Sequence, residues 1–182
     1  MKYIAVFCSA VDLDDKYTIP AKDLAKLIAE SGYGLVWGGS DTGLMKVIAD
    51  GVQDGGGKIV GVSIKKFESI MRKNADEMVV AKDLNERKDT MLTRCDGVVA
   101  MVGGIGTLDE VTHILELKKH GDHEKPVVIL NTDHFYDGLS EQIRKMKQDG
   151  FIKQNVSEMI YFAETPEDVM AYLGRKLDVM SV

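Results

Sequence analysis

The feature that most constrains the fold is a series of short apolar runs that alternates with segments of helical periodicity. These runs are rich in Val, Ile and Ala, and they occupy residues 3–7, 34–37, 59–62, 78–80, 97–101, 127–130 and 159–162. Runs of this length and composition are typical of strands buried on both faces of a parallel sheet. Between most of them, apolar residues recur three or four positions apart, the spacing of one helix face, as in Leu24, Leu27 and Ile28.

This alternation predicts an α/β fold, a Rossmann-like three-layer sandwich with a doubly wound, mainly parallel sheet. Pro126 stands at a strand entry, and Pro166 follows Thr165 as a capped helix start. Because no long linker or internal repeat interrupts the pattern, residues 1–182 are predicted to form a single domain. Ligands of such sheets bind beyond the carboxyl ends of the strands, where the strand order reverses. The turns that follow the strands are therefore the candidate site.

Composition excludes several classes of partner. The formal net charge of −6 argues against nucleic acid, because neutralising phosphates needs a clustered basic face. No apolar run approaches the roughly 20 residues that span a bilayer, so no membrane association is expected. Cys8 and Cys95 are too few for a disulfide framework, which favours a cytoplasmic location.

Two turns dense in glycine follow predicted strands. GGSDTGLM (38–45) has the spacing of a phosphate-binding P-loop, but Leu44 and Met45 stand where Lys and Ser/Thr are required. In GGIGTLDE (103–110), Asp109 stands where the dinucleotide fingerprint needs a third Gly or Ala. Each turn still places glycine amides at a helix N-terminus, which attracts one anionic group such as phosphate or sulfate. The alternative is that the glycines only close tight turns.

Glu110 has two interpretations. Thr107 and Glu110 have the spacing of a capping box, with Thr107 as the N-cap and Glu110 bonding back to its amide. A cap does not require Gly104 and Gly106, however, and these glycines suggest a ligand that approaches the backbone. Glu110 is then either a helix cap or a group that faces the ligand.

A second anomaly lies in NERKDTMLTRC (85–95). One helical stripe is formed by apolar residues, and Arg87 and Lys88 fill its i+3 and i+4 positions; the apolar members are Leu84, Met91, Leu92 and Cys95. Two cations on an inward face need a carboxylate or phosphate as partner. The alternative is that both long side chains reach out to solvent.

Several motifs together resemble the LOG, or lonely guy, family. The resemblance runs in register from about residue 3 to 152 and is carried by VFCSA (6–10), GGSDTGLMKVIADG (38–51), ERKxxM (86–91), CDGVVAMVGGIGTLDE (95–110) and KPVVILN (125–131). Members of that family are cytokinin riboside 5'-monophosphate phosphoribohydrolases, often labelled possible lysine decarboxylases. The resemblance implies a nucleotide-binding domain that hydrolyses the N-glycosidic bond of AMP or N6-substituted AMP. The products would be the free purine base and ribose 5-phosphate.

The resemblance also implies roles for individual residues. Arg87 and Glu110 would be the catalytic pair, since a carboxylate can stabilise the positive charge that develops on the ribose. Substrate would be bound by the glycine turns and their neighbours, namely Ser9, Gly38, Gly39, Gly43, Lys88, Met91, Gly103, Gly104, Ile105, Gly106 and Thr107. No metal or organic cofactor is required. Family members assemble as dimers or larger oligomers, so the resemblance implies a homodimer.

Three departures from the family pattern keep a second function open. Val102 replaces a proline, Ser40 replaces the third glycine of its turn, and Glu116 adds a charge where many members have none. They allow a nucleotide-binding module with little or no turnover. Two further activities find no support. The set Asp109, His113, His120 and His123 lacks the spacing of a metal site, and lysine decarboxylation needs a pyridoxal phosphate site that only generic lysines suggest.

Overall fold

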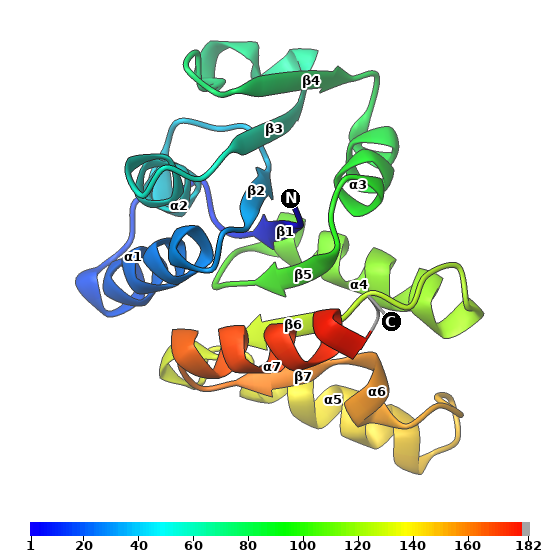
Figure 1. Ribbon diagram of the computed structural model, residues 1–182. Helices are drawn as coiled ribbons and strands as arrows, with labels where there is room; N and C mark the ends of the chain where they lie inside the picture. The colour runs from blue at the N-terminus through cyan, green and yellow to red at the C-terminus, as the bar shows by residue number, and fades with distance from the viewer. Residues whose placement is uncertain (180–182) are drawn as a thin grey trace.

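The computed structural model describes residues 1–179 and contains one seven-stranded sheet in which every strand pair is parallel (Figure 1). The strands are β1 (Tyr3–Phe7), β2 (Gly34–Trp37), β3 (Ile59–Ile64), β4 (Glu77–Ala81), β5 (Gly97–Ala100), β6 (Val127–Leu130) and β7 (Tyr161–Ala163). The predicted fold class is confirmed. The last predicted strand is shifted, because Met159 ends a short helix and β7 begins at Tyr161.

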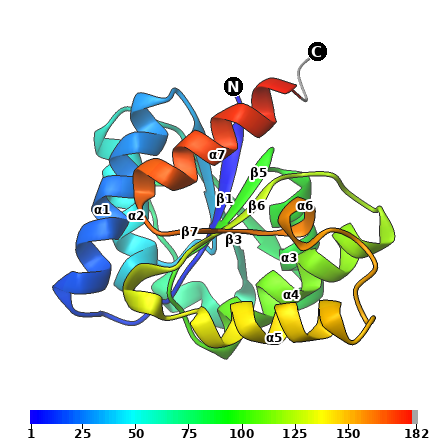
Figure 2. The same cartoon turned by 90° about the horizontal axis from the view of Figure 1, so that it is seen from below.

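Helices cover both faces of the sheet, as Figure 2 shows. One face carries α1 (Asp15–Glu30), α2 (Gly43–Asp54) and α7 (Pro166–Val179), and the other carries α3 (Leu84–Thr93), α4 (Ile105–His120), α5 (Asp137–Gln148) and α6 (Val156–Met159). Two short 3-10 helices, η1 (Lys65–Ile70) and η2 (Thr132–His134), follow β3 and β6. Pro166 starts α7 as predicted. Within residues 1–179, no helix combines the length and the apolar character needed to cross a membrane.

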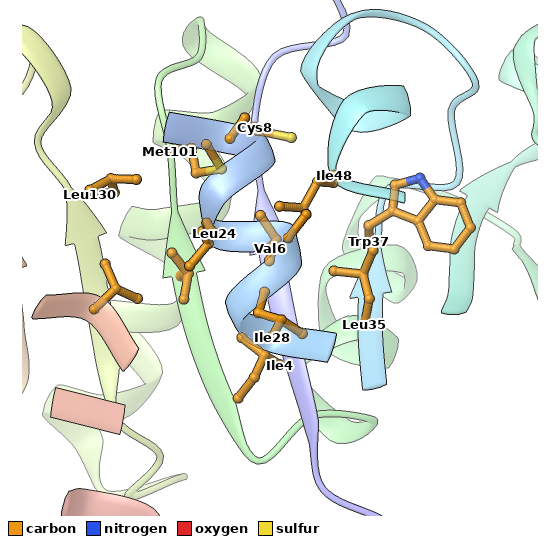
Figure 3. Packing of buried hydrophobic residues seen from close by; sticks show 14 of the residues in the cluster. Ile4, Val6, Cys8, Leu24, Ile28, Leu35, Trp37, Ile48, Met101 and Leu130 are labelled. Carbon is orange, nitrogen blue, oxygen red and sulfur yellow. The ribbon is translucent and has the colours of Figure 1, made fainter. Parts of the chain in front are cut away.

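The strands alternate between two apolar cores, because successive side chains of a strand point to opposite faces. Ile4 and Val6 of β1 pack with Leu24 and Ile28 of α1 in one core (Figure 3), while Phe7 belongs to the other. All of these side chains are fully or almost fully buried. Close packing on both faces gives the strand ends little freedom to move, so the point at which each turn begins is fixed.

The strand order, β4-β3-β2-β1-β5-β6-β7, reverses direction between β1 and β5. These two strands pair in register from Ile4 with Gly97 to Phe7 with Ala100. Their carboxyl ends therefore open the crevice in which sheets of this kind bind ligands. The turn after β2 and the turn after β5, both rich in glycine, lie at this same edge of the sheet.

Candidate functional site

A cavity of about 330 Å³ lies at the point where the strand order reverses. The turns after β1, β2, β3 and β5 and the start of α3 line it, with the residues Cys8, Ser9, Ala10, Gly38, Ser40, Met45, Phe67, Ile70, Leu84, Arg87, Lys88, Gly104, Gly106, Thr107, Asp109 and Glu110. Residues far apart in the sequence thus meet in one place, as the parallel topology requires.

A buried ion pair supplies charged groups to the lining of the cavity. Arg87 of α3 donates from Nη1 to Glu110 Oε1 of α4 at 2.5 Å, and from Nε to the carbonyl of Val62 at 2.9 Å. The two side chains are 7% and 8% exposed. Such a pair holds both groups in a fixed geometry, because moving either one would leave a charge unpaired in a low-dielectric site.

The first turn of α4 differs from the predicted capping box. The N-cap is Gly104 rather than Thr107, and no side chain of the described residues caps this helix. Glu110 bonds Arg87 and is therefore not a cap. The capping-box interpretation is wrong, because the buried guanidinium supplies a stronger, charge-assisted partner for the carboxylate. The first amides of α4 consequently have no side-chain partner, and Gly106 and Thr107 line the cavity.

Gly104 and Gly106 have no steric role within the protein itself. Apart from chain neighbours and the backbone of the same helix, a Cβ atom built at either position would meet no atom of residues 1–179 within 4 Å, although both residues line the cavity. Gly104 also has an ordinary negative φ of −89°. The tight-turn explanation therefore does not account for these two glycines, and what they preserve is open space beside the helix N-terminus. Gly103 differs, since its Cβ would lie 2.1 Å from Thr107 Oγ1.

The glycines of the turn after β2 do have steric roles. A Cβ on Gly38 would lie 2.2 Å from Nη2 of Arg87, so this glycine makes room for the guanidinium. Gly39 and Gly43 have φ angles of +74° and +57°, a region that side chains disfavour. This turn shapes the wall of the cavity and starts α2 behind it.

Gly43→Ala is expected to lower the free energy of unfolding by more than about 2 kcal/mol, because the new methyl group adds both left-handed strain and a clash. Its Cβ would lie 2.3 Å from the carbonyl carbon of Ala10. The melting temperature should fall by roughly 4–8 °C or more for a domain of this size. Gly56→Ala is the matched control, since Gly56 has a φ of +80° and open space around it. Equal losses in both variants would contradict a contribution from the clash.

Burial and neighbouring charges set the protonation of Glu110. Burial raises the pKa of the Glu110 carboxyl above its usual value, and Arg87 opposes this rise without cancelling it. Asp109 adds to the rise, while Lys88 lowers the pKa. Lys88 is itself buried and donates to Asp109 at 2.9 Å. Both cations therefore have carboxylate partners, and the alternative in which they reach out to solvent is wrong.

The structure separates the remaining predicted binding residues into two groups. The cavity is lined by Ser9, Gly38, Lys88, Gly104, Gly106 and Thr107, whereas Gly39, Gly43, Met91, Gly103 and Ile105 lie outside its lining. Met91 is fully buried in the core, and Ile105 is 82% exposed. Leu84, predicted on the inward stripe of α3, is instead half exposed, because it is the first residue of the helix, and it lines the cavity.

Four apolar side chains that no sequence motif predicts also line the cavity, and we refer to them as the apolar wall. They are Met45, Phe67, Ile70 and Leu84. Phe67 and Ile70 lie in the 3-10 segment after β3, where single apolar residues have no periodicity, whereas Met45 and Leu84 lie in the first turns of α2 and α3. Cys8 also lines the cavity, but burial raises the pKa of its thiol well above the usual range, which disfavours a nucleophilic thiolate.

The departures from the family pattern lie mostly away from the cavity. Glu116 contacts Lys119 and His120 on the exposed side of α4, so its charge does not enter the site. Val102 is buried, and its carbonyl accepts from the amide of Ser9. Ser40 does line the cavity.

The histidines that were considered as metal ligands in the sequence contact different partners. His113 contacts Asp89, and His123 contacts the carbonyl of Ile114. Among residues 1–179, no three His, Cys, Asp or Glu side chains are grouped to hold a metal ion.

Comparison with known proteins places the chain in a family. A family model described as possible lysine decarboxylase matches residues 45–173. The probable cytokinin riboside 5'-monophosphate phosphoribohydrolase LOGL3 of Oryza sativa subsp. japonica is 34% identical over 93% of this chain and 82% of its own length. The chain belongs to the LOG family. The cytokinin riboside 5'-monophosphate phosphoribohydrolase LOG4 of Arabidopsis thaliana is 32% identical, over 93% of the chain and 80% of its own length.

Solved structures share the fold of this LOG-family protein. The molybdenum cofactor binding protein of Rippkaea orientalis superposes with a TM-score of 0.75 at 24% identity, covering 97% of both chains. The molybdenum cofactor carrier protein of Chlamydomonas reinhardtii gives a TM-score of 0.73 at 23% identity, covering 98% of this chain and 99% of its own. Identity at this level shows a common fold only.

Proposed function

We propose that this LOG-family protein hydrolyses the N-glycosidic bond of a purine nucleoside 5'-monophosphate, AMP or an N6-substituted AMP. The products are the free base and ribose 5-phosphate. One observation carries the proposal: the buried Arg87–Glu110 pair and the uncapped N-terminus of α4 line the same cavity. A phosphate and a reacting sugar can therefore occupy it together. Assembly as a homodimer in the cytoplasm belongs to the same proposal.

The start of α4 suits a single phosphate. Its first amides have no side-chain cap, and the positive end of the helix dipole favours an anion there. Gly104 and Gly106 leave open space beside these amides, where a phosphate oxygen can approach the backbone. Thr107, which lines the cavity, adds a hydroxyl within the same turn. We assign the phosphate of the nucleotide to this position.

Glu110 suits the chemistry of the ribose. Cleavage of the bond between C1' and the base nitrogen leaves positive charge on the sugar ring, which a nearby carboxylate stabilises. A water molecule then supplies the oxygen on C1', and its proton leaves with the base. Arg87 fixes the carboxylate and also lines the cavity, with its Nη2 beside Gly38. The apolar side chains of Met45, Phe67, Ile70 and Leu84 suit the flat face of the purine.

The direct test is to incubate the protein with AMP or isopentenyladenosine monophosphate and to follow the free base by chromatography. We expect adenine or the substituted base to accumulate together with ribose 5-phosphate. Absence of base at high protein concentration would defeat the proposal. Thermal stabilisation by AMP without product would instead support the alternative, a nucleotide-binding module.

A further inference from the structure

The segment after β3 lines part of the cavity although it contributes no buried residue to either apolar core. No residue of η1 (Lys65–Ile70) is buried, yet Phe67 and Ile70 line the cavity. A segment without buried apolar contacts opens readily unless other bonds hold it. What holds this segment therefore decides the position of the apolar wall.

Backbone bonds join the segment to the glycine turn after β2. The amide of Asp41 donates to the carbonyl of Ile70 at 2.8 Å, and the amide of Arg72 donates to the carbonyl of Gly39 at 2.9 Å. Ser40 and Met71 form an isolated antiparallel bridge between these bonds. The wall segment and the turn that makes room for Arg87 thus behave as one short ribbon.

The side chain of Arg72 fastens this ribbon to α2. Arg72 is 7% exposed, and its Nη1 donates to Asp41 at 3.0 Å and to Asp50 at 2.6 Å. Its Nη2 donates to the side-chain oxygen of Gln53 at 2.8 Å. Burial favours the neutral acid at Asp50, but hydrogen bonds from Lys46 and Arg72 hold its pKa below the usual value. One guanidinium therefore joins the turn, the wall segment and the helix.

The cluster of Arg72, Asp41, Asp50 and Gln53 is better explained by a role in positioning the segment than by a contribution to the free energy of unfolding. Arg72 Nε is buried and has no hydrogen-bond partner within residues 1–179, which costs free energy. Arg72 is buried, but its partners Asp41 and Asp50 are 44% and 36% exposed, and charge pairs with exposed members contribute little to stability. A planar guanidinium with three fixed partners does, however, allow only one arrangement of the elements that it joins.

We propose that Arg72 is a positioning residue that sets the location of the Phe67–Ile70 wall and thereby the selectivity for the base. The inference rests on the proposed function, because it assigns the apolar wall to the base of the nucleotide. Arg72 is not among the residues that line the cavity, so it acts through the segment that it fastens. Replacing Arg72 should therefore change binding of the base, measured as KM, more than cleavage of the N-glycosidic bond, measured as kcat.

The test compares Arg72→Met with the wild type on AMP and on isopentenyladenosine monophosphate. We expect KM for the substituted nucleotide to rise about tenfold, the order that one misplaced apolar contact produces, with a smaller rise for AMP. The value of kcat should stay within about threefold, because Arg87 and Glu110 are untouched. Arg72→Lys should lose less selectivity than Arg72→Met. If Arg72→Met does not fold, a partial loss of selectivity in Arg72→Lys is the expected result, and unchanged selectivity would overturn the proposal. An equal change on both nucleotides would overturn the proposal.

Arg144→Met is the matched control. Arg144 is exposed on α5 and pairs with Glu141, so its removal should change neither KM nor selectivity. A selectivity change of the same size in this variant would also overturn the proposal, because it would show a general effect of losing an arginine.

A second readout is independent of turnover. Trp37 is the single tryptophan of the chain, and its indole N–H donates to the carbonyl of Ser40 at 3.2 Å, within the turn that Arg72 fastens. In Arg72→Met we expect shifted Trp37 emission and faster amide hydrogen exchange in residues 65–72, and neither change in Arg144→Met. Absence of base release by the wild type would overturn the proposed function and the selectivity that rests on it, but not the position that Arg72 gives to residues 65–72. Unchanged emission and exchange in Arg72→Met would overturn the positioning role, whatever the turnover.

Discussion

Glu110→Gln is expected to lower kcat by at least about 10²–10³-fold, the range found when one preorganised electrostatic group is removed from an active site. The amide keeps the size of the side chain and can still accept a bond from Arg87, but it carries no negative charge for the sugar. Release of free base, followed by chromatography at saturating nucleotide, measures the loss. Thermal stabilisation by AMP should persist, because the phosphate is assigned to the start of α4 rather than to Glu110.

Glu116→Gln is the control for this experiment. It removes a carboxylate from the same helix, on the exposed side where Glu116 contacts Lys119 and His120. Its kcat should match that of the wild type. Turnover retained in Glu110→Gln would contradict the assigned chemistry, and loss of turnover in both variants would point to the net charge instead.

Arg87→Met is expected to have the largest effect on stability, about 3–5 kcal/mol near neutral pH, because it leaves the buried Glu110 without its cation. Urea unfolding of both proteins across a pH series measures the difference. The folded-state pKa of Glu110 is already raised, and removing Arg87 raises it further. The folded variant then binds a proton more readily than the folded wild type. Its deficit relative to the wild type should therefore shrink as the pH falls from the folded-state pKa of Glu110 in the variant toward that in the wild type.

Arg87→Met should also shift the acid limb of the pH profile of kcat/KM. The proposed chemistry needs the carboxylate form of Glu110, so activity is lost as the pH falls through its folded-state pKa. The limb should move to higher pH in Arg87→Met. It should move to lower pH in Asp109→Asn, because Asp109 raises the pKa of Glu110. Limbs that stay in place in both variants would show that Glu110 is not the group that titrates.

The predicted cap of α4 shows where local patterns mislead. Thr107 and Glu110 have the spacing of a capping box, but Glu110 is bound by Arg87, which comes from another helix. The capping-box spacing considers only the amides of the same helical turn as partners for the Glu110 carboxylate. It takes no account of the Arg87 guanidinium, whose Nη1 the fold brings to 2.5 Å from Glu110 Oε1. The anomaly of two inward cations was the better signal, since buried charge needs a partner wherever it lies in the sequence.

The apolar wall shows a different reason for missing site residues. Phe67 and Ile70 lie in a segment without helical or strand periodicity in its burial, and their position depends on Arg72 and on backbone bonds to residues 39–41. No motif marks such residues, because their role arises only when separate segments are joined. Arg72 itself was not predicted for the same reason.

The sequence by itself determined the class of the fold and the edge of the sheet at which the site lies. Strands buried on both faces need continuous apolar runs, and the helices between them need apolar residues at every third or fourth position, so both signals are local. Only the tertiary structure decided which charges pair, which amides stay uncapped and which loops form the cavity wall. These outcomes depend on competition among partners far apart in the chain, and that competition is settled when the strand order brings β1 and β5 together.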